Sequence, residues 1–223
     1  MLSTPACQIS NLTFSVPTAE VHAYVRATLP PPPARILEVG AGSGELADAL
    51  REAGYDVLAI DPAGGPGVVQ IPLLEVEGTF DAAVAVVSMH HVEPLAESVE
   101  RLAAVLPEGA RFVVDEFDVG AYDERAARWW LGHAEHRDHE PGDLVADLRG
   151  HLHSVETIVG ALRRWFDVGV PVRGTYLHRW EIGPALRGDE EEAVAAGLIP
   201  ATGARFIATR ASRAPSAPPP PPA

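Results

Sequence analysis

Three glycines in one short turn are the residues whose spacing most clearly points to chemistry. Gly40, Gly42 and Gly44 follow the apolar run 36–39, and Glu38 lies two residues before the first glycine. Glycine allows positive φ angles and lets a ligand approach the backbone closely. A strand, a glycine turn and a helix in this order present backbone N–H groups to a ligand. The same pattern also fits a tight turn without a ligand, so its surroundings must decide.

An acid at the end of the next strand supplies the second half of a candidate binding site. Residues 55–61 predict a strand that ends at Asp61, which lies 21 residues after Gly40. In a βαβ unit of this length, such an acid can accept hydrogen bonds from both hydroxyls of a ribose. The alternative is that Asp61 only begins the turn at Pro62. Because the glycine turn and the acid occur together, we interpret them as a nucleotide-binding site.

Side chains that can accept a proton occur near the ends of two later strands. His90 and His91 follow one predicted strand, and Asp115 and Glu116 end another. Ligands of open α/β sheets bind at the carboxyl ends of strands. Successive side chains of a strand point to opposite faces, so only one of Asp115 and Glu116 is expected to face a cavity. Among these side chains, we select His91 and Glu116 as candidate catalytic residues.

Tryptophans and histidines form a third group of candidates. Trp129 and His133 are four residues apart, and His133 and His136 are three apart, so they can share a helix face. We select both histidines as candidate bases, and Trp129 or Trp130 as an apolar wall for an organic ligand. The alternative is an exposed polar helix packed by its tryptophans. A divalent metal suits histidines and Glu116 chemically, but no recognisable ligand spacing is present, and we predict no metal site.

Alternating strands and helices must position these residues. The predicted strands lie within residues 36–39, 55–61, 68–71, 80–87, 110–117, 168–180 and 204–209. The predicted helices lie within residues 18–29, 46–53, 94–106, 122–139, 143–152, 155–166 and 189–198. Such alternation implies an α/β fold with a parallel sheet and right-handed crossovers. Residues 118–154 hold more than a crossover needs, so we interpret them as an inserted helical lid.

The ends of the chain and its composition narrow the class of protein. We predict a flexible or capping arm at 1–17, one domain at 18–211 and a disordered proline-rich tail at 212–223. The net charge of -14 argues against a nucleic-acid-binding surface, which needs clustered Lys and Arg. Cys7 is the only cysteine, so no intramolecular disulfide is possible. We recognise neither a secretory signal nor an apolar run near the ~20 residues of a membrane span. We therefore expect a cytoplasmic protein with a small-molecule partner.

Four motifs, in this order, resemble those of class I S-adenosylmethionine-dependent methyltransferases. They are Glu38-x-Gly40-x-Gly42-x-Gly44, the strand 57–62, the strand 80–87 with the following 88–92, and the helix-turn-strand 102–114. Together they span residues 36 to about 117, which is more than a third of the chain. Glu45 occupies the third glycine position of a nicotinamide fingerprint, so a dehydrogenase is the least favoured interpretation. The resemblance implies a Rossmann-like, seven-stranded, mostly parallel sheet with helices on both faces and an antiparallel last strand.

The resemblance also implies roles for individual residues toward S-adenosylmethionine. Glu38 would orient the turn or meet the amino group of the cofactor, and Asp61 would bind the ribose hydroxyls. Pro62 would touch the adenine, and Ser88 and Met89 would lie on the methylthio side. The full implied cofactor-binding set is Glu38, Gly40, Ala41, Gly42, Gly44, Asp61, Pro62, Ser88 and Met89.

Two departures from the family pattern and the available bases shape the predicted function. No acid follows the third predicted strand at residues 71–72 to contact the adenine, and residues 107–110 keep only part of the usual double glycine. Methyl transfer needs alignment above all, and a hydroxyl acceptor also needs a base. We therefore predict methyl transfer to a small organic acceptor, preferably at oxygen. The alternatives are a non-methylating reaction on the same fold, or a non-catalytic binding partner that uses the proline-rich tail.

Overall fold

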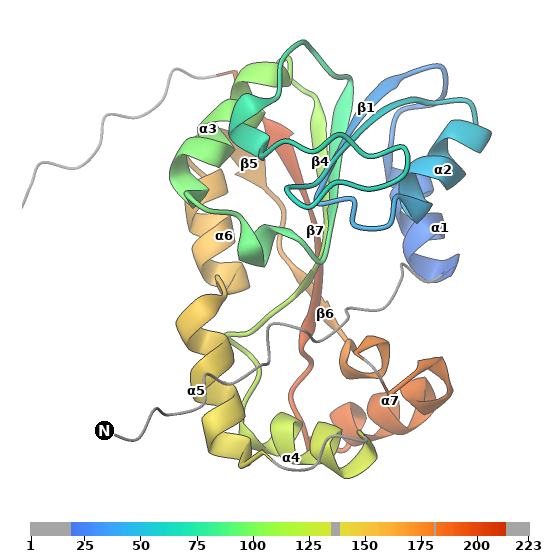
Figure 1. Ribbon diagram of the computed structural model, residues 1–223. Helices are drawn as coiled ribbons and strands as arrows, with labels where there is room; N and C mark the ends of the chain where they lie inside the picture. The colour runs from blue at the N-terminus through green and yellow to red at the C-terminus, as the bar shows by residue number, and fades with distance from the viewer. Residues whose placement is uncertain (1–18, 135–138, 181, 213–223) are drawn as a thin grey trace, which may run out of the picture.

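A seven-stranded sheet runs through the middle of this computed structural model, which describes residues 19–134, 139–180 and 182–212 (Figure 1). The strands are β1 Arg35–Val39, β2 Asp56–Ile60, β3 Ala82–Val86, β4 Arg111–Phe117, β5 Phe166–Val168, β6 Val172–Gly174 and β7 Gly203–Arg210. The helices are α1 Ala19–Thr28, α2 Glu45–Glu52, α3 Leu95–Val105, α4 Glu124–His133, α5 Pro141–His151, α6 Val155–Leu162 and α7 Arg187–Ala195. The arm predicted at 1–17 lies outside the described residues, as does the tail beyond residue 212.

The strand directions confirm the predicted sheet. The order is β2-β1-β3-β4-β7-β5, and β6 also pairs with β7. The first four strands are parallel, whereas β7 is antiparallel to β4, β5 and β6. Val39 pairs in register with Ile60 on one side and with Ala85 on the other. The carboxyl ends of the three strands therefore meet at one edge of the sheet, where open α/β sheets bind ligands.

Two predicted strands differ from the structure. The run 68–71 forms two isolated bridges in place of a strand: Val69 pairs with Ile60 in parallel, and Val68 pairs with Gly65 in antiparallel. The following Pro72 lacks the N–H that a longer ladder requires. The run 168–180 contains two short strands, and Val170 between them is 88% exposed. Its last residues form a 3-10 turn, Leu177–Arg179, in place of a strand.

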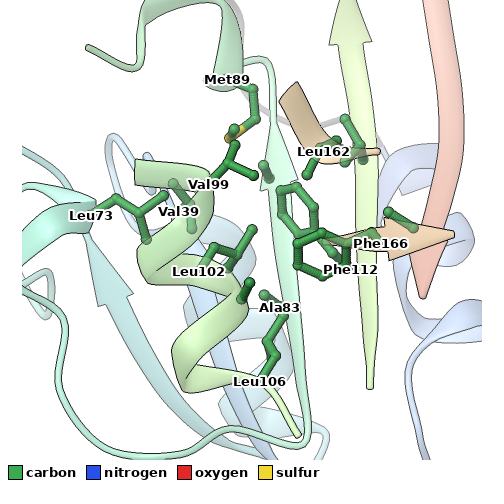
Figure 2. Packing of buried hydrophobic residues seen from close by; sticks show 14 of the residues in the cluster. Val39, Leu73, Ala83, Met89, Val99, Leu102, Leu106, Phe112, Leu162 and Phe166 are labelled. Carbon is green, nitrogen blue, oxygen red and sulfur yellow. The ribbon is translucent and has the colours of Figure 1, made fainter. Parts of the chain in front are cut away.

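Helices cover both faces of the sheet, with α3 and α6 on one face and α1 and α2 on the other (Figure 1). Side chains of a strand alternate, so each strand contributes to both layers. Figure 2 shows Val99 and Leu102 of α3 packed over Ala83 and Phe112, together with Leu162 of α6. These five side chains are fully buried. Burial of this kind contributes about 1.5–3 kcal/mol for each large aliphatic side chain.

A third group of buried side chains lies beyond the carboxyl edge of the sheet, where Figure 1 shows α4 and α7. We call it the distal cluster; its largest members are Phe117, Tyr122, Trp130, Tyr176 and Trp180. The Trp130 indole stacks on that of Trp180 at 4.5 Å, and its Nε1–H donates to the Trp180 carbonyl over 2.8 Å. The segment 118–154 therefore packs with residues 175–199, which follow β6 and which the sequence did not associate with it. No helix in the described part of the chain is long and apolar enough to cross a membrane.

Candidate functional site

A cavity of about 690 Å³ opens at the carboxyl ends of β1, β2 and β3. We call it the glycine-turn cavity, because the turn after β1 forms one wall. Seven of the nine predicted cofactor-binding residues line it: Glu38, Gly40, Ala41, Gly42, Asp61, Pro62 and Ser88. Of the predicted catalytic residues, His91 lines it as well. The structure thus brings together side chains that lie as much as 53 residues apart in the sequence.

The glycine turn has a backbone that only glycine adopts readily. Gly40 has a φ of 70°, and a Cβ there would overlap the Ser88 side chain, 2.8 Å from its Oγ. That hydroxyl donates to the Val39 carbonyl over 2.6 Å, which ties β1 to the end of β3. Gly42, at a φ of 51°, has no atom within 4 Å of a built Cβ, so its requirement is conformational. The turn therefore needs Gly40 for space and both glycines for their backbone angles.

Asp61 joins the glycine turn to the tip of β2. Its Oδ2 accepts from the Gly42 N–H over 3.1 Å, and its Oδ1 accepts from the Ala63 N–H over 2.8 Å. A carboxylate oxygen can accept more than one hydrogen bond. Both oxygens therefore keep capacity for a ligand hydroxyl at the cavity wall, in a position fixed by two backbone donors.

Glu38 is the strongest electrostatic feature of the glycine-turn cavity. Its side chain is 3% exposed, and burial raises its pKa from 4.5 to about 8. The Arg51 guanidinium opposes this shift, Asp48 adds to it, and the Ala47 N–H opposes it. Oε2 of Glu38 has no hydrogen-bond partner among the described residues. A buried carboxyl with an unpaired oxygen at a cavity wall is suited to a cationic ligand group.

Apolar residues and one strained backbone complete the cavity, and sequence reasoning missed both. Ile71, Pro72 and Leu73 form an apolar stretch of wall, at the place where the family acid is absent. Val87, at the end of β3, has a φ of 53°, which is rare for a β-branched residue. Its N–H donates to the Asp115 carbonyl over 2.8 Å, which holds this conformation. Such strain is typical of functional sites, and no sequence pattern indicates it.

His91 lies at the exposed rim of the cavity. Partial burial lowers its pKa to about 4, and the neighbouring His90 lowers it further, whereas Glu116 acts in the opposite direction. The rings of His90 and His91 are 4.2 Å apart. At neutral pH the His91 imidazole is therefore uncharged, so it does not repel a cationic ligand. A pKa this low also makes it a weak base.

Glu116 and Met89 lie elsewhere than the sequence predicted. The Glu116 carboxylate is fully buried and accepts from the N–H groups of Met89 and Phe117 over 2.9 and 2.8 Å. It also bonds to His90 Nδ1 at 2.5 Å. Met89 is fully buried in the α3 layer of the core (Figure 2). Neither residue lines the cavity, so the expectation of direct contact is corrected: Glu116 fixes the turn that carries His91.

The third group of candidates is also separate from this cavity. His133 is exposed, and its Nδ1 bonds to the Trp129 carbonyl at 2.8 Å. The two rings are 4.4 Å apart, so they do share a helix face. Trp130 is 1% exposed and belongs to the distal cluster, so it cannot serve as the wall of an open site. His136 lies outside the described residues. Gly44 precedes α2 and faces Val68 rather than the cavity.

No group of three or more His, Cys, Asp or Glu side chains among the described residues could hold a metal ion. The histidines near the end of α5 have other partners. His151 Nδ1 bonds to the Asp147 carbonyl at 2.8 Å, and His153 Nε2 lies 2.9 Å from Glu93 Oε1. The described site is therefore built from backbone, carboxylates and apolar side chains.

Comparison with known proteins decides the family. The family model of a methyltransferase domain matches residues 16–149, which is more than half of the chain. The chain belongs to this methyltransferase family. No curated protein sequence matches it significantly. The resemblance to S-adenosylmethionine-dependent methyltransferases is thereby confirmed. The prediction of an enzyme that uses this cofactor is confirmed with it.

Solved structures share the fold of this methyltransferase. An S-adenosylmethionine-dependent methyltransferase from Mesorhizobium loti is 19% identical at a TM-score of 0.57, with 86% of this chain and 98% of that one covered. The 1,6-didemethyltoxoflavin-N1-methyltransferase of Burkholderia thailandensis, solved with S-adenosylhomocysteine, is 20% identical at 0.52, with 87% and 76% covered. The [4+2]-cyclase SpnF is 17% identical at 0.54, with 86% and 80% covered.

The glycine-turn cavity fits the cofactor of this methyltransferase family. Glu38 offers an unpaired buried oxygen for an amino group, and Asp61 offers acceptors for a ribose. The missing Cβ at Gly40 lets the Ser88 side chain pack directly against the glycine turn. Ile71 and Leu73 provide an apolar surface for a heteroaromatic ring.

Proposed function

We propose that this methyltransferase transfers the methyl group of S-adenosylmethionine to a hydroxyl of a small organic acceptor. One observation carries the proposal: a single cavity of about 690 Å³ joins the glycine turn, Asp61 and the unpaired oxygen of Glu38. A dipolar, cationic nucleoside requires this combination of acceptors. When bound, the cofactor supplies a methyl group already activated by its sulfonium.

The residues of the cavity then act by binding and orientation. Glu38 would pair with the amino group, and its burial makes that pairing stronger than one in water. Asp61, fixed by Gly42 and Ala63, would hold the ribose, and Ile71 would pack on the base. Two fixed ends leave the reacting part of the cofactor little freedom, and alignment of this kind is the main protein contribution to displacement reactions.

An oxygen acceptor is favoured by the side chains at this edge of the sheet that can accept a proton. A hydroxyl must lose its proton as the new bond forms. His91 at the rim is uncharged at neutral pH, so it adds no positive charge next to the sulfonium of the cofactor. A non-methylating reaction is the second candidate, because one protein that shares the fold is a cyclase.

Calorimetry with the full chain tests the cofactor site. S-Adenosylmethionine and S-adenosylhomocysteine should bind the wild type, and Asp61→Ala should weaken both by more than tenfold, because it removes both ribose acceptors. Asp56→Ala is the matched control, since Asp56 is an exposed acid at the other end of β2 and should have no effect. Equal affinities for the Asp61 variant and the wild type would refute the ribose assignment.

Label transfer distinguishes methylation from the alternative reaction. Protein loaded with methyl-labelled cofactor should move the label to a hydroxyl compound. A compound that is converted while the label stays on the cofactor would instead identify a non-methylating enzyme.

A further inference from the structure

A second cavity, of about 410 Å³, lies at the same edge of the sheet, next to the cofactor strands. We call it the arginine cavity. Asp115 of β4, Arg173 of β6 and Arg205 of β7 contribute to its wall. Asp115 is the register partner of Val86, which lines the glycine-turn cavity. Paired residues of adjacent parallel strands point to the same face at a spacing of about 4.8 Å. The two cavities are therefore neighbours on one face of the sheet.

His178 supplies a fixed imidazole to the wall of the arginine cavity. It lies in the 3-10 turn Leu177–Arg179 and is 5% exposed. Its Nδ1 lies 2.7 Å from Oε2 of Glu190, a fully buried residue of α7. The same carboxylate accepts from the N–H groups of Tyr176, Leu177 and His178 over 2.7, 2.9 and 2.8 Å.

The hydrogen bonds of Glu190 determine which imidazole nitrogen carries the proton. Burial opposes ionisation of Glu190, but the His178 side chain and the three backbone donors lower its pKa overall. An ionised carboxylate only accepts hydrogen bonds, so Nδ1 of His178 must be the donor. In the neutral ring Nε2 is then the acceptor. No described residue is hydrogen-bonded to this Nε2.

Four arginines and three carboxylates give the lining of the cavity a net positive charge. The arginines are Arg173, Arg179, Arg187 and Arg205, and the carboxylates are Glu20, Asp115 and Glu191. Arg179 and Arg205 bond to opposite oxygens of Asp115 at 2.6 and 2.5 Å, and Asp115 is 2% exposed. Glu20 reaches Arg205 at 2.7 Å from the exposed rim, where solvent screens its charge. In a chain with a net charge of -14, such a lining favours an anionic group, and Arg205, whose side chain is 28% exposed, is open to it.

Building on the proposed function, we propose that the arginine cavity binds the methyl acceptor, and that this acceptor is a hydroxy-carboxylate. Arg205 holds its carboxylate, and His178 is the catalytic base that Glu190 positions. Nε2 takes the hydroxyl proton while the oxygen lone pair forms the bond to the methyl carbon and the carbon–sulfur bond breaks. The positive charge lost at sulfur then resides on the imidazolium, next to the Glu190 carboxylate.

A binding measurement tests the site without relying on turnover. The probe is 3,4-dihydroxybenzoate, added to ¹⁵N-histidine-labelled protein loaded with S-adenosylhomocysteine. We expect the imidazole signals of His178 to shift and those of His151, an exposed histidine on α5, to stay. Before addition, the His178 ring should show a protonated Nδ1 and an unprotonated Nε2, and Glu190→Gln should change that signature. Unchanged His178 signals on addition, or a protonated Nε2, would overturn the proposal.

A transfer measurement tests the base. His178→Asn keeps an N–H donor toward Glu190 but removes the proton acceptor, so the turn is retained. We expect kcat for label transfer to 3,4-dihydroxybenzoate to fall about 100-fold or more, with KM within threefold. His151→Asn is the matched control and should be unaffected. Catechol, which lacks the carboxylate, should show a kcat/KM at least tenfold lower.

The outcomes separate this inference from the proposed function. Transfer at an unchanged rate by His178→Asn, or better transfer to catechol, would overturn the inference and leave methylation intact. If 3,4-dihydroxybenzoate shifts the His178 NMR signals but no label moves to either hydroxyl compound, the proposed methyl transfer is contradicted, whereas the arginine cavity remains a binding site.

Discussion

Binding of S-adenosylmethionine should expel a proton from Glu38. In the free protein, burial raises the pKa of this carboxyl to about 8, and its Oε2 is unpaired among the described residues. At pH 6.5 the group is therefore mostly protonated. The amino group of the cofactor is a cation at this pH, and a cation in contact with a carboxyl favours its ionised form. Cofactor binding and loss of the proton are thus coupled.

The size of the coupling follows from the pKa values. At pH 6.5, a group with a pKa of about 8 is roughly 97% protonated. A direct ion pair lowers a carboxyl pKa by up to about 3 units, so a drop of about 2.5 units would leave roughly 9% protonated. An α-amino group takes up only about 0.05 proton under these conditions. Net release should therefore be about 0.8 proton per cofactor bound.

Calorimetry in several buffers measures this release directly. The observed binding enthalpy at pH 6.5 should vary with the ionisation enthalpy of the buffer, and the slope gives the number of protons. Glu38→Gln should bind the cofactor more weakly and give a slope near zero, because it has no proton to lose. A wild-type slope near zero, or one of the opposite sign, would show that Glu38 does not meet the amino group.

Three further predictions concern the free protein and its core. Between the unfolded pKa of 4.5 and the folded pKa of about 8, native Glu38 keeps a proton that the unfolded chain loses. Glu38 therefore destabilises the fold increasingly as the pH rises, by about 3 kcal/mol at pH 7. Glu38→Gln should raise Tm at pH 8 and leave it unchanged at pH 4. Gly40→Ala should reduce cofactor affinity more than tenfold in calorimetry, because its Cβ overlaps Ser88; an unchanged affinity would show that the turn can shift. Trp130→Ala should lower the free energy of unfolding in denaturant titrations by about 3–5 kcal/mol through loss of the Trp180 stack. It should leave cofactor affinity intact in the folded protein. Trp129→Ala, at a half-buried position, should lower the free energy of unfolding by less.

The cofactor half of the molecule could be predicted because its signals are local. A buried strand, a glycine turn and an acid at the next strand tip lie within 27 residues, between Arg35 and Asp61. Each element positions its neighbour through the backbone, as the bond from the Gly42 N–H to Asp61 shows. The position of Met89 differs from the prediction, because a residue just past a strand end can turn into the core. The hydrogen bond from its N–H to the buried Glu116 makes Met89 do so.

The region beyond the sheet was predicted less well because it is assembled from two distant segments. Periodicity within 118–154 identified helices there, but Trp130 is buried by Trp180, fifty residues later. A helix with tryptophan and histidine on its surface looks like a ligand wall only until its packing partner is known. The amphipathic pattern gives the buried face of a helix, and it does not say what covers that face.

Asp115 and Glu116 show where local reasoning stops. Alternation along β4 requires the two carboxylates to point to opposite faces, and they do: Asp115 lines the arginine cavity and Glu116 bonds to His90. Which face opens into a cavity depends on the chain after β6, because His178 and Arg179 reach β4 from there. His178 itself gains significance only from Glu190, which is twelve residues away on α7 and fixes its tautomer. A candidate base is therefore identified by the acceptor that orients its ring and by the cavity that it lines, and both are properties of the folded chain.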